Sequence, residues 1–425
     1  MSKKSVTAFV AACLLALTMP LAAQQRSSSQ QVNNCEKCHG KLMRKYSQPV
    51  KLYEQDIHNS VGILCSDCHG GNPSNERRHD REDPAQDFLG VTEPADIPQM
   101  CNKCHGDATY MRSFNPSLPV DQMEKYVTSR HGQLLLEEGD TQVAQCVSCH
   151  SVHDIRRAGE PGSPVYPPNL PQTCARCHSD AEHMADYGIP TDQYEQFASS
   201  VHGVPLLERG DVAAPACNDC HSNHGAFPPE VSDISAVCGM CHVNNQTLYR
   251  QSFHAEFFEM LESPGCVTCH GNHGIAPPDD AMLGEGDESV CGACHEQEAD
   301  DPGFAVGLAM KATLDSLTTL INSAEELVEL AEQKGMETSD LAFQLRDMRQ
   351  SYTQARTQVH TFDDSIVAAS VRPGLELGHQ TAAEAKMLLE EHKSRRWWLA
   401  GATLILLMVI GTLYLKMREV EGGQR

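Results

Sequence analysis

The sequence predicts a mainly α-helical protein with much irregular loop, and three observations support this fold class. The motif Cys-x-x-Cys-His recurs nine times between residues 35 and 295, in a chain with 30 Gly and 23 Pro. Apolar residues at helical spacing follow between residues 304 and 392. An uninterrupted apolar run then covers residues 397–415. We therefore expect a domain of short helices, a C-terminal bundle or hairpin of long helices, and one transmembrane helix.

Residues 1–23 have the composition of a secretory signal peptide. Lys3 and Lys4 precede an apolar stretch that ends in small residues near Ala23. A lipoprotein cleavage box at Cys13 is the alternative, but the apolar stretch continues well past that residue, which fits a single signal peptide better. We therefore expect the region with the repeated motif to be exported.

Two Cys three residues apart, followed directly by His, have the spacing that covalent attachment of a c-type haem requires. The two thiols add to the two vinyl groups of one haem, and the adjacent His is placed beneath the iron as its proximal ligand. Zinc sites and disulfides also use paired Cys, but neither explains a His after every second Cys. We therefore predict nine covalently bound haems. The attachment residues are Cys35, Cys38, Cys65, Cys68, Cys101, Cys104, Cys146, Cys149, Cys174, Cys177, Cys217, Cys220, Cys238, Cys241, Cys266, Cys269, Cys291 and Cys294, and the proximal ligands are His39, His69, His105, His150, His178, His221, His242, His270 and His295.

Nine further His between residues 35 and 300 are candidate distal ligands, one for each iron. Ser-x-His opens a short helical stretch before three of the motifs, and another His follows three motifs at a fixed distance, so two types of haem are expected to alternate along the chain. The first group is His131, His202 and His254, the second is His153, His224 and His273, and the less regular candidates are His58, His79 and His183.

Other residues remain open as ligands in place of the irregular candidates. Three His lie in the C-terminal helical region, and four Met lie near the motifs, although Met more often fills space in a core. If both axial positions of every iron are filled by His, the irons are low-spin and closed to substrate, which suits electron transfer. These alternatives are His360, His379 and His392, and Met43, Met100, Met111 and Met184.

Residues 35–300 are too few to bury nine haems separately. We expect the haems to pack against one another and against short helices and loops, in place of an ordinary hydrophobic core. Such packing brings haem edges together, so that electrons pass from haem to haem. Pro-rich loops, such as 161–168, separate the units.

The region 304–392 predicts amphipathic helices that pack on one another. One helix ends near Gly335, and a second begins near Ser339 and is expected to break at Arg372-Pro373-Gly374. A third helix from about Leu375 continues into the apolar run 397–415, which is long enough to span a bilayer. Residues 416–425 are then a cytoplasmic tail. A buried C-terminal helix of a soluble core is the alternative.

The net charge of −24 argues against binding to nucleic acid, which needs a basic surface. It also argues against a mainly electrostatic hold on anionic lipids. We expect a partner that docks on this acidic surface to present a positive patch.

The repeated Cys-x-x-Cys-His-x-x-His frame resembles that of the multihaem cytochromes c. This superfamily includes small cytochromes of the c3 type, tetrahaem quinol dehydrogenases, and octahaem enzymes such as hydroxylamine oxidoreductase and tetrathionate reductase. The resemblance covers residues 35–295 and implies haem ligation, without specifying a reaction. No Cys-x-x-Cys-Lys motif is present, which argues against the lysine-ligated haem of pentahaem nitrite reductases.

The full set of His leads us to expect an electron-transfer protein more than an enzyme. It would be held by its C-terminal helix on the periplasmic side of the bacterial inner membrane, in a respiratory chain. The expected partners are a quinol-oxidising membrane protein and periplasmic or outer-membrane cytochromes. Two alternatives remain: an oxidoreductase with one open haem for a small nitrogen or sulfur compound, and direct oxidation of quinol near the single span.

Overall fold

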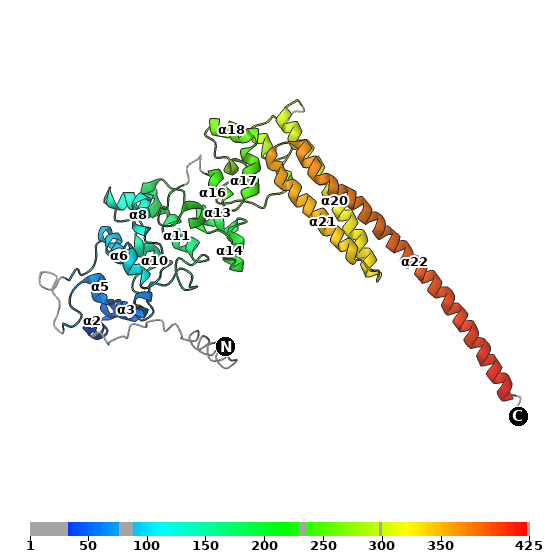
Figure 1. Cartoon of the computed structure of the whole chain (residues 1–425), viewed down its shortest axis with the longest axis horizontal. Coiled ribbons are helices and arrows are strands. Elements are labelled where there is room, and N and C mark those ends of the chain that lie inside the picture. The colour runs from blue at the N-terminus through cyan, green and yellow to red at the C-terminus, as the bar shows by residue number, and fades with distance from the viewer. Residues whose placement is uncertain (1–32, 76–87, 229–233, 297–299, 423–425) are drawn as a thin grey trace, which may run out of the picture. The chain divides into compact units, whose positions relative to one another are not determined.

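The computed structural model describes residues 33–75, 88–228, 234–296 and 300–422 (Figure 1). The predicted signal peptide and His79 lie outside these residues. The chain forms two compact units, one with the residues up to Thr191 and Pro205–Phe227, the other with Asp192–Val204 and the residues from Pro228 onward. Among the described residues, the one contact of β type is a bridge between Gly70 and Phe88. The predicted fold class, helical with irregular loops and long C-terminal helices, is confirmed.

The first unit consists of short helices joined by loops, and all but one of its helices have fewer than ten residues. They are α2 (Asn34–His39), α3 (Arg44–Tyr53), α4 (Ile57–Ser60), α5 (Cys65–His69), η1 (Pro94–Asp96), α6 (Ile97–His105), α7 (Ala108–Arg112), α8 (Gln122–Thr128), α9 (Arg130–Leu136), α10 (Cys146–His150), α11 (Leu170–His178), α12 (Ala181–Met184), η2 (Ala185–Tyr187) and α15 (Cys217–His221).

The second unit joins similar short helices to three long ones. Helix α14 (Gly203–Arg209) begins in this unit and ends in the first. The short helices are α13 (Gln193–Ser199), α16 (Ile234–Gly239), α17 (Val243–Arg250), α18 (Phe253–Met260), α19 (Cys266–His270), η4 (Asp280–Met282), η5 (Cys291–Ala293) and η6 (Val359–Thr361), and the long ones are α20 (Pro302–Gln333), α21 (Ser339–Gln358) and α22 (Asp364–Gly422).

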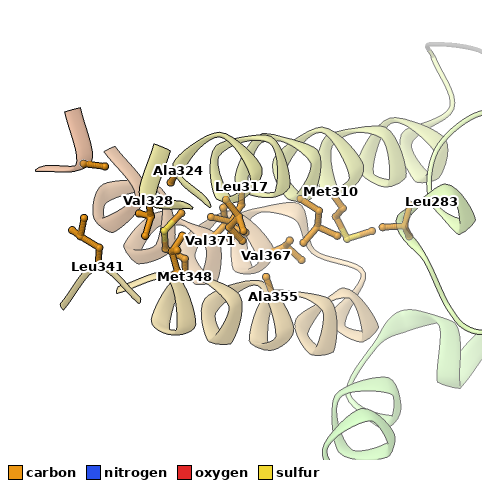
Figure 2. Close-up of a cluster of buried hydrophobic side chains, with 14 residues drawn as sticks. Leu283, Met310, Leu317, Ala324, Val328, Leu341, Met348, Ala355, Val367 and Val371 are labelled. Carbon is orange, nitrogen blue, oxygen red and sulfur yellow. The ribbon is translucent and has the colours of Figure 1, made fainter. Parts of the chain in front are cut away.

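The three long helices form a bundle, with α22 packed against both α20 and α21 (Figure 1). Apolar residues at helical spacing meet along its axis, among them Leu317 of α20, Met348 of α21 and Val371 of α22, each fully buried (Figure 2). Leu283, which follows η4, belongs to the same cluster. The core thus extends from the bundle to the loop that precedes the ninth motif.

The expected helix break at Arg372-Pro373-Gly374 is wrong, because Pro373 lies inside α22. The break comes earlier, at η6, where Phe362 adopts a left-handed conformation (φ 53°). Val371 is fully buried on one side of Pro373, and Gly374 fits closely against Leu317 on the other, where an added Cβ would come within 3.1 Å. Packing on both sides of Pro373 outweighs the cost of the missing backbone N–H.

Two described helices, α20 and α22, are long and apolar enough to cross a membrane. Helix α20 contributes a large part of the bundle core, whereas the end of α22 packs on nothing in the described chain. Its side chains are exposed, including Trp397 (79%) and Leu406 (60%).

Candidate functional site

Opposite seven of the motif histidines, the described chain places the ring of a second histidine. The distances between ring centres fall in a narrow range, from 5.9 to 6.3 Å. The pairs are His58/His105, His69/His153, His131/His178, His150/His224, His202/His242, His254/His295 and His270/His360.

This separation fits one iron between the two rings. An imidazole nitrogen binds a first-row metal at about 2.0 Å, and its ring centre lies about 1.1 Å farther out, so two opposed ligands have ring centres about 6 Å apart. Aromatic rings in contact without a metal have centres about 4.5–7 Å apart, so the motif that supplies one ring of each pair is the deciding observation. Because one ring of each pair belongs to a Cys-x-x-Cys-His motif, the residues present fit a covalently held haem with two His ligands.

The seven pairs fall into two geometric types. In one type, the second histidine comes from the start of a helix that precedes another motif, and the ring planes are steeply inclined, at 90°, 69°, 45° and 67° for His58/His105, His131/His178, His202/His242 and His254/His295. In the other type the planes are nearly parallel, at 25°, 12° and 27° for His69/His153, His150/His224 and His270/His360. The two types alternate along the sequence, as the repeat predicts.

The Ser-x-His frame has a local structural cause. Ser129 Oγ donates to Tyr126 O (2.6 Å) and accepts from Gly132 N (2.9 Å), which fixes the start of α9 and therefore the direction of His131. A Cβ on Gly132 would lie 1.9 Å from Tyr126 O. Only glycine permits this approach at Gly132, whereas the third copy of the frame has Ala255 after His254. Ser200 and Gly203 repeat the arrangement, with a Cβ on Gly203 placed 1.8 Å from Phe197 O.

A backbone hydrogen bond links the two kinds of distal ligand. The residue before His58 donates its N–H to the carbonyl of Ile155, two residues after His153 (2.8 Å). The same bond recurs from Arg130, which precedes His131, to Ala226 (3.2 Å), and from Val201 to Ile275 (2.9 Å). Each such bond holds the two segments that carry these histidines at a fixed offset.

Hydrogen bonds donated by Nδ1–H orient several of the rings and leave Nε2 for the metal. The acceptor is a carboxylate oxygen for His58 (Asp56, 2.9 Å) and for His295 (Asp301, 3.0 Å). It is a backbone carbonyl for His69 (Gly90, 2.9 Å), His221 (Phe227, 3.3 Å) and His360 (Thr357, 3.0 Å).

Asp56 is the most buried of these acceptors, at 4% exposure. Burial raises the pKa of its carboxyl group, but hydrogen bonds from the side chain and backbone of His58 and from the N–H of Ile155 outweigh burial and lower the pKa overall. Asp56 is therefore ionised at neutral pH, and it binds His58 as an anion.

Burial also keeps many of the rings neutral, which is the form that binds a metal. Desolvation is the largest cause of the lowered pKa in each case, with a neighbouring histidine often adding to it. The pKa is lowered at His105, His131, His150, His153, His178, His202, His224, His254, His270 and His360.

The first cysteines of neighbouring motifs contact each other. The Sγ atoms of Cys101 and Cys146 lie next to each other, and so do those of Cys174 and Cys217 and those of Cys238 and Cys266. Each sulfur would be bonded to the edge of its own haem. These contacts would therefore hold the attachment points of the third and fourth, fifth and sixth, and seventh and eighth haems close together.

The remaining predicted ligands have other placements. His183 packs against Tyr187 (5.9 Å between ring centres), and its helix α12 is capped by Asp180 in the same way as α7 is capped by Asp107. His183 therefore takes the place that Tyr110 has in α7. The motif residue His39 lies near Tyr46 (6.1 Å between ring centres), and His273 follows α19.

The bundle contributes directly to the last two haem sites. His360 of η6 faces His270, and Phe362, two residues later, packs on His254 with its ring centre 3.9 Å away. Asp301 accepts hydrogen bonds both from His295 and from the N–H of Phe304 (2.9 Å), at the start of α20. From the sequence, the role of His360 is open. A signal was present, because His360 has an apolar residue at the second position after it, like His153, His224 and His273.

Comparison with known families agrees with this geometry. Residues 57–179 match the family described as cytochrome c3, and residues 259–300 match the doubled CXXCH motif. No curated protein and no solved structure matches the chain. The two family matches support a multihaem c-type cytochrome with covalently bound haem iron, and hence electron transfer through haems.

Proposed function

We propose that this chain is a nonahaem c-type cytochrome, tethered to the membrane by the end of α22, that carries electrons in a respiratory chain on the periplasmic side. The observation that carries the proposal is the set of opposed histidine rings, because two strong ligands on one iron leave no position for a substrate. A c-type haem supplies an iron that changes oxidation state without exchanging ligands.

The protein residues hold the redox centres rigidly and close together. Opposed histidines from distant parts of the chain fix each ring pair, so little movement accompanies a change of charge. The contacts Cys101/Cys146, Cys174/Cys217 and Cys238/Cys266 bring successive attachment points together, which favours transfer between neighbours.

We assign His360 as the distal ligand of the eighth haem, and His183 as a surface residue of the repeat. The assignment rests on the 6.1 Å separation of the His360 and His270 rings and on the position that His183 shares with Tyr110. The partners that we propose are a quinol-oxidising membrane protein as donor and periplasmic or outer-membrane cytochromes as acceptors.

Haem content and spin state test the redox function. We expect nine haems per chain by quantitative haem assay and mass spectrometry, with only low-spin signals in the electron paramagnetic resonance (EPR) spectrum of the oxidised protein. Nitrite, hydroxylamine and tetrathionate should leave the spectrum unchanged. A high-spin iron that binds one of them would instead identify the chain as an enzyme with an open haem.

Extraction of the membrane fraction tests the tether. Arg at the centre of a spanning helix costs about 2.5–3.5 kcal/mol on insertion scales. We expect the double substitution Leu406→Arg, Leu407→Arg to release the protein, whereas the matched change Leu406→Phe, Leu407→Phe leaves it in the membrane. Release of both variants by alkaline carbonate would argue against a spanning helix.

A further inference from the structure

The distal histidine of the ninth motif has an unusual environment. Nδ1 of His254 is buried and has no hydrogen-bond partner among the described residues. His58 likewise lies in a short helix just before a motif, but its Nδ1 donates a hydrogen bond to Asp56. Protein atoms cover Nδ1 of His254, so bulk water does not reach it. A buried polar group without a partner is unfavourable, so another contact must hold this ring.

Phe362 supplies that contact. Its ring centre lies 3.9 Å from that of His254, with the planes inclined by 35°, closer than any other pair of rings described for this ligand. Phe362 has φ 53°, a conformation unfavourable for a bulky side chain. The chain adopts this conformation at the turn between α21 and α22. Phe362 lies two residues after the distal histidine His360, as Ile155 lies two residues after His153.

We infer that Phe362 is a positioning residue for the ninth haem, which fixes the plane of His254 and closes its Nδ1 off from every hydrogen-bond acceptor. The inference rests on the proposed function, because it takes His254 as a ligand. An imidazole whose N–H has no acceptor gives less electron density to the metal than one bonded to a carboxylate or carbonyl. The oxidised iron is then less stabilised, and the reduction potential of this haem is higher than it would be with a bonded ligand.

Phe362 also sets the ring angle of the pair. The planes of His254 and His295 are 67° apart, and Asp301 holds His295 from the other side. Phe362 and Asp301 lie at the same end of the bundle, so this one end would hold both rings of the ninth haem site.

The test is the substitution Phe362→Gly in the full haem-loaded chain. Glycine accepts φ 53° without strain, so the variant removes the ring and keeps the turn. We expect one haem to change: its potential falls, because water reaches Nδ1, and its EPR signal shifts as the ring of His254 turns. Phe362→Tyr should restore both readouts, and Phe343→Ala, which changes an exposed residue of α21 (58%), should alter neither.

Unchanged potentials and spectra in Phe362→Gly would overturn the inference. An equal change in the His270/His360 haem would also overturn it, because the whole turn would then have moved. The variant His254→Ala separates this result from failure of the proposed function. If it retains every low-spin signal, His254 is not a ligand and the ligand assignment itself fails. If one signal is lost while Phe362→Gly has no effect, only the positioning role fails.

Discussion

The ring centre of His360 lies 6.1 Å from that of His270, with the ring planes 27° apart, although the two residues are far apart in sequence. His270 belongs to the eighth haem motif, and His360 to the turn between two helices of the bundle. In the earlier pairs of this type, the distal histidine follows the motif two places farther along the chain, as His153 does for His69 and His224 does for His150, and here the turn takes that place. The bundle therefore ends the array of repeats in the manner of a capping unit, and it supplies the ligand that a further repeat would have supplied.

Replacing His360 should open one iron. We expect His360→Ala to retain nine haems and to convert one low-spin signal to high spin, because one iron loses its distal ligand. Free imidazole should restore the low-spin signal by occupying the vacated position. His379→Ala is the matched control, since this residue is exposed on α22. A spectrum of His360→Ala identical to that of the parent would show that another residue ligates the eighth haem.

The attachment sites and most candidate distal ligands can be predicted from the sequence because their chemistry is local. Ser129, His131 and Gly132 are needed together at the start of one short helix, so they recur as a recognisable frame. His360 has no such frame, since its direction comes from a helix turn. The pairing of distal with proximal histidines is likewise set by tertiary packing, and no spacing in the sequence contains it.

The alternating ring angles predict two classes of EPR signal. Near-parallel imidazole planes split the two iron orbitals of π symmetry and give a rhombic low-spin spectrum. Steeply inclined planes leave these orbitals close in energy and give a single, strongly shifted low-field feature. We expect both classes in the oxidised protein, with His150/His224 (12°) typical of the first and His58/His105 (90°) typical of the second. A spectrum with one class alone would contradict the alternation.

His183 and His131 should respond differently to substitution. The ring of His183 packs against Tyr187, as that of Tyr110 packs against Phe114, whereas His131 faces the motif residue His178. We expect His131→Ala to remove one low-spin signal and His183→Ala to remove none. The reverse result, read from EPR spectra of the two variants with equal haem content, would make His183 a ligand.

The helix break expected at Pro373 is wrong, and it shows where intrinsic helix propensity fails as a guide. Pro373 and Gly374 disfavour a helix when they are considered alone, and a break there was a reasonable expectation. In the structure the neighbours Val367 and Val371 are fully buried against α20 and α21, which holds the helix through this point. Burial of this kind depends on helices distant in sequence, so no local pattern reports it.

One strained position offers a gain in stability. Ser222, directly after the sixth motif, has φ 70° and ψ 165°, a region that favours glycine, and Gly70 and Gly271 occupy the equivalent positions after the second and eighth motifs. We expect Ser222→Gly to raise the free energy of unfolding by about 1 kcal/mol. Ser179, after the fifth motif, has φ −103°, so Ser179→Gly should give no gain. The guanidinium concentration at the midpoint of unfolding, measured for both variants, tests this prediction. Equal shifts of the two midpoints would exclude backbone strain at Ser222 as the cause.

Asp301 has two roles that substitution can separate. Its Oδ1 caps α20 by accepting from Phe304 N, and the same oxygen lies 3.0 Å from Nδ1 of His295. Asn caps a helix nearly as well as Asp, but its neutral carbonyl is a weaker acceptor for the imidazole N–H. Asp301→Asn should therefore keep the unfolding midpoint and raise the potential of one haem, because His295 then gives less electron density to iron. Asp301→Ala should raise the same potential further and also lower stability by about 1 kcal/mol through loss of the cap.

Redox titration and thermal unfolding of both Asp301 variants distinguish the two roles. If both variants lose stability while every haem potential is unchanged, Asp301 is a helix cap alone.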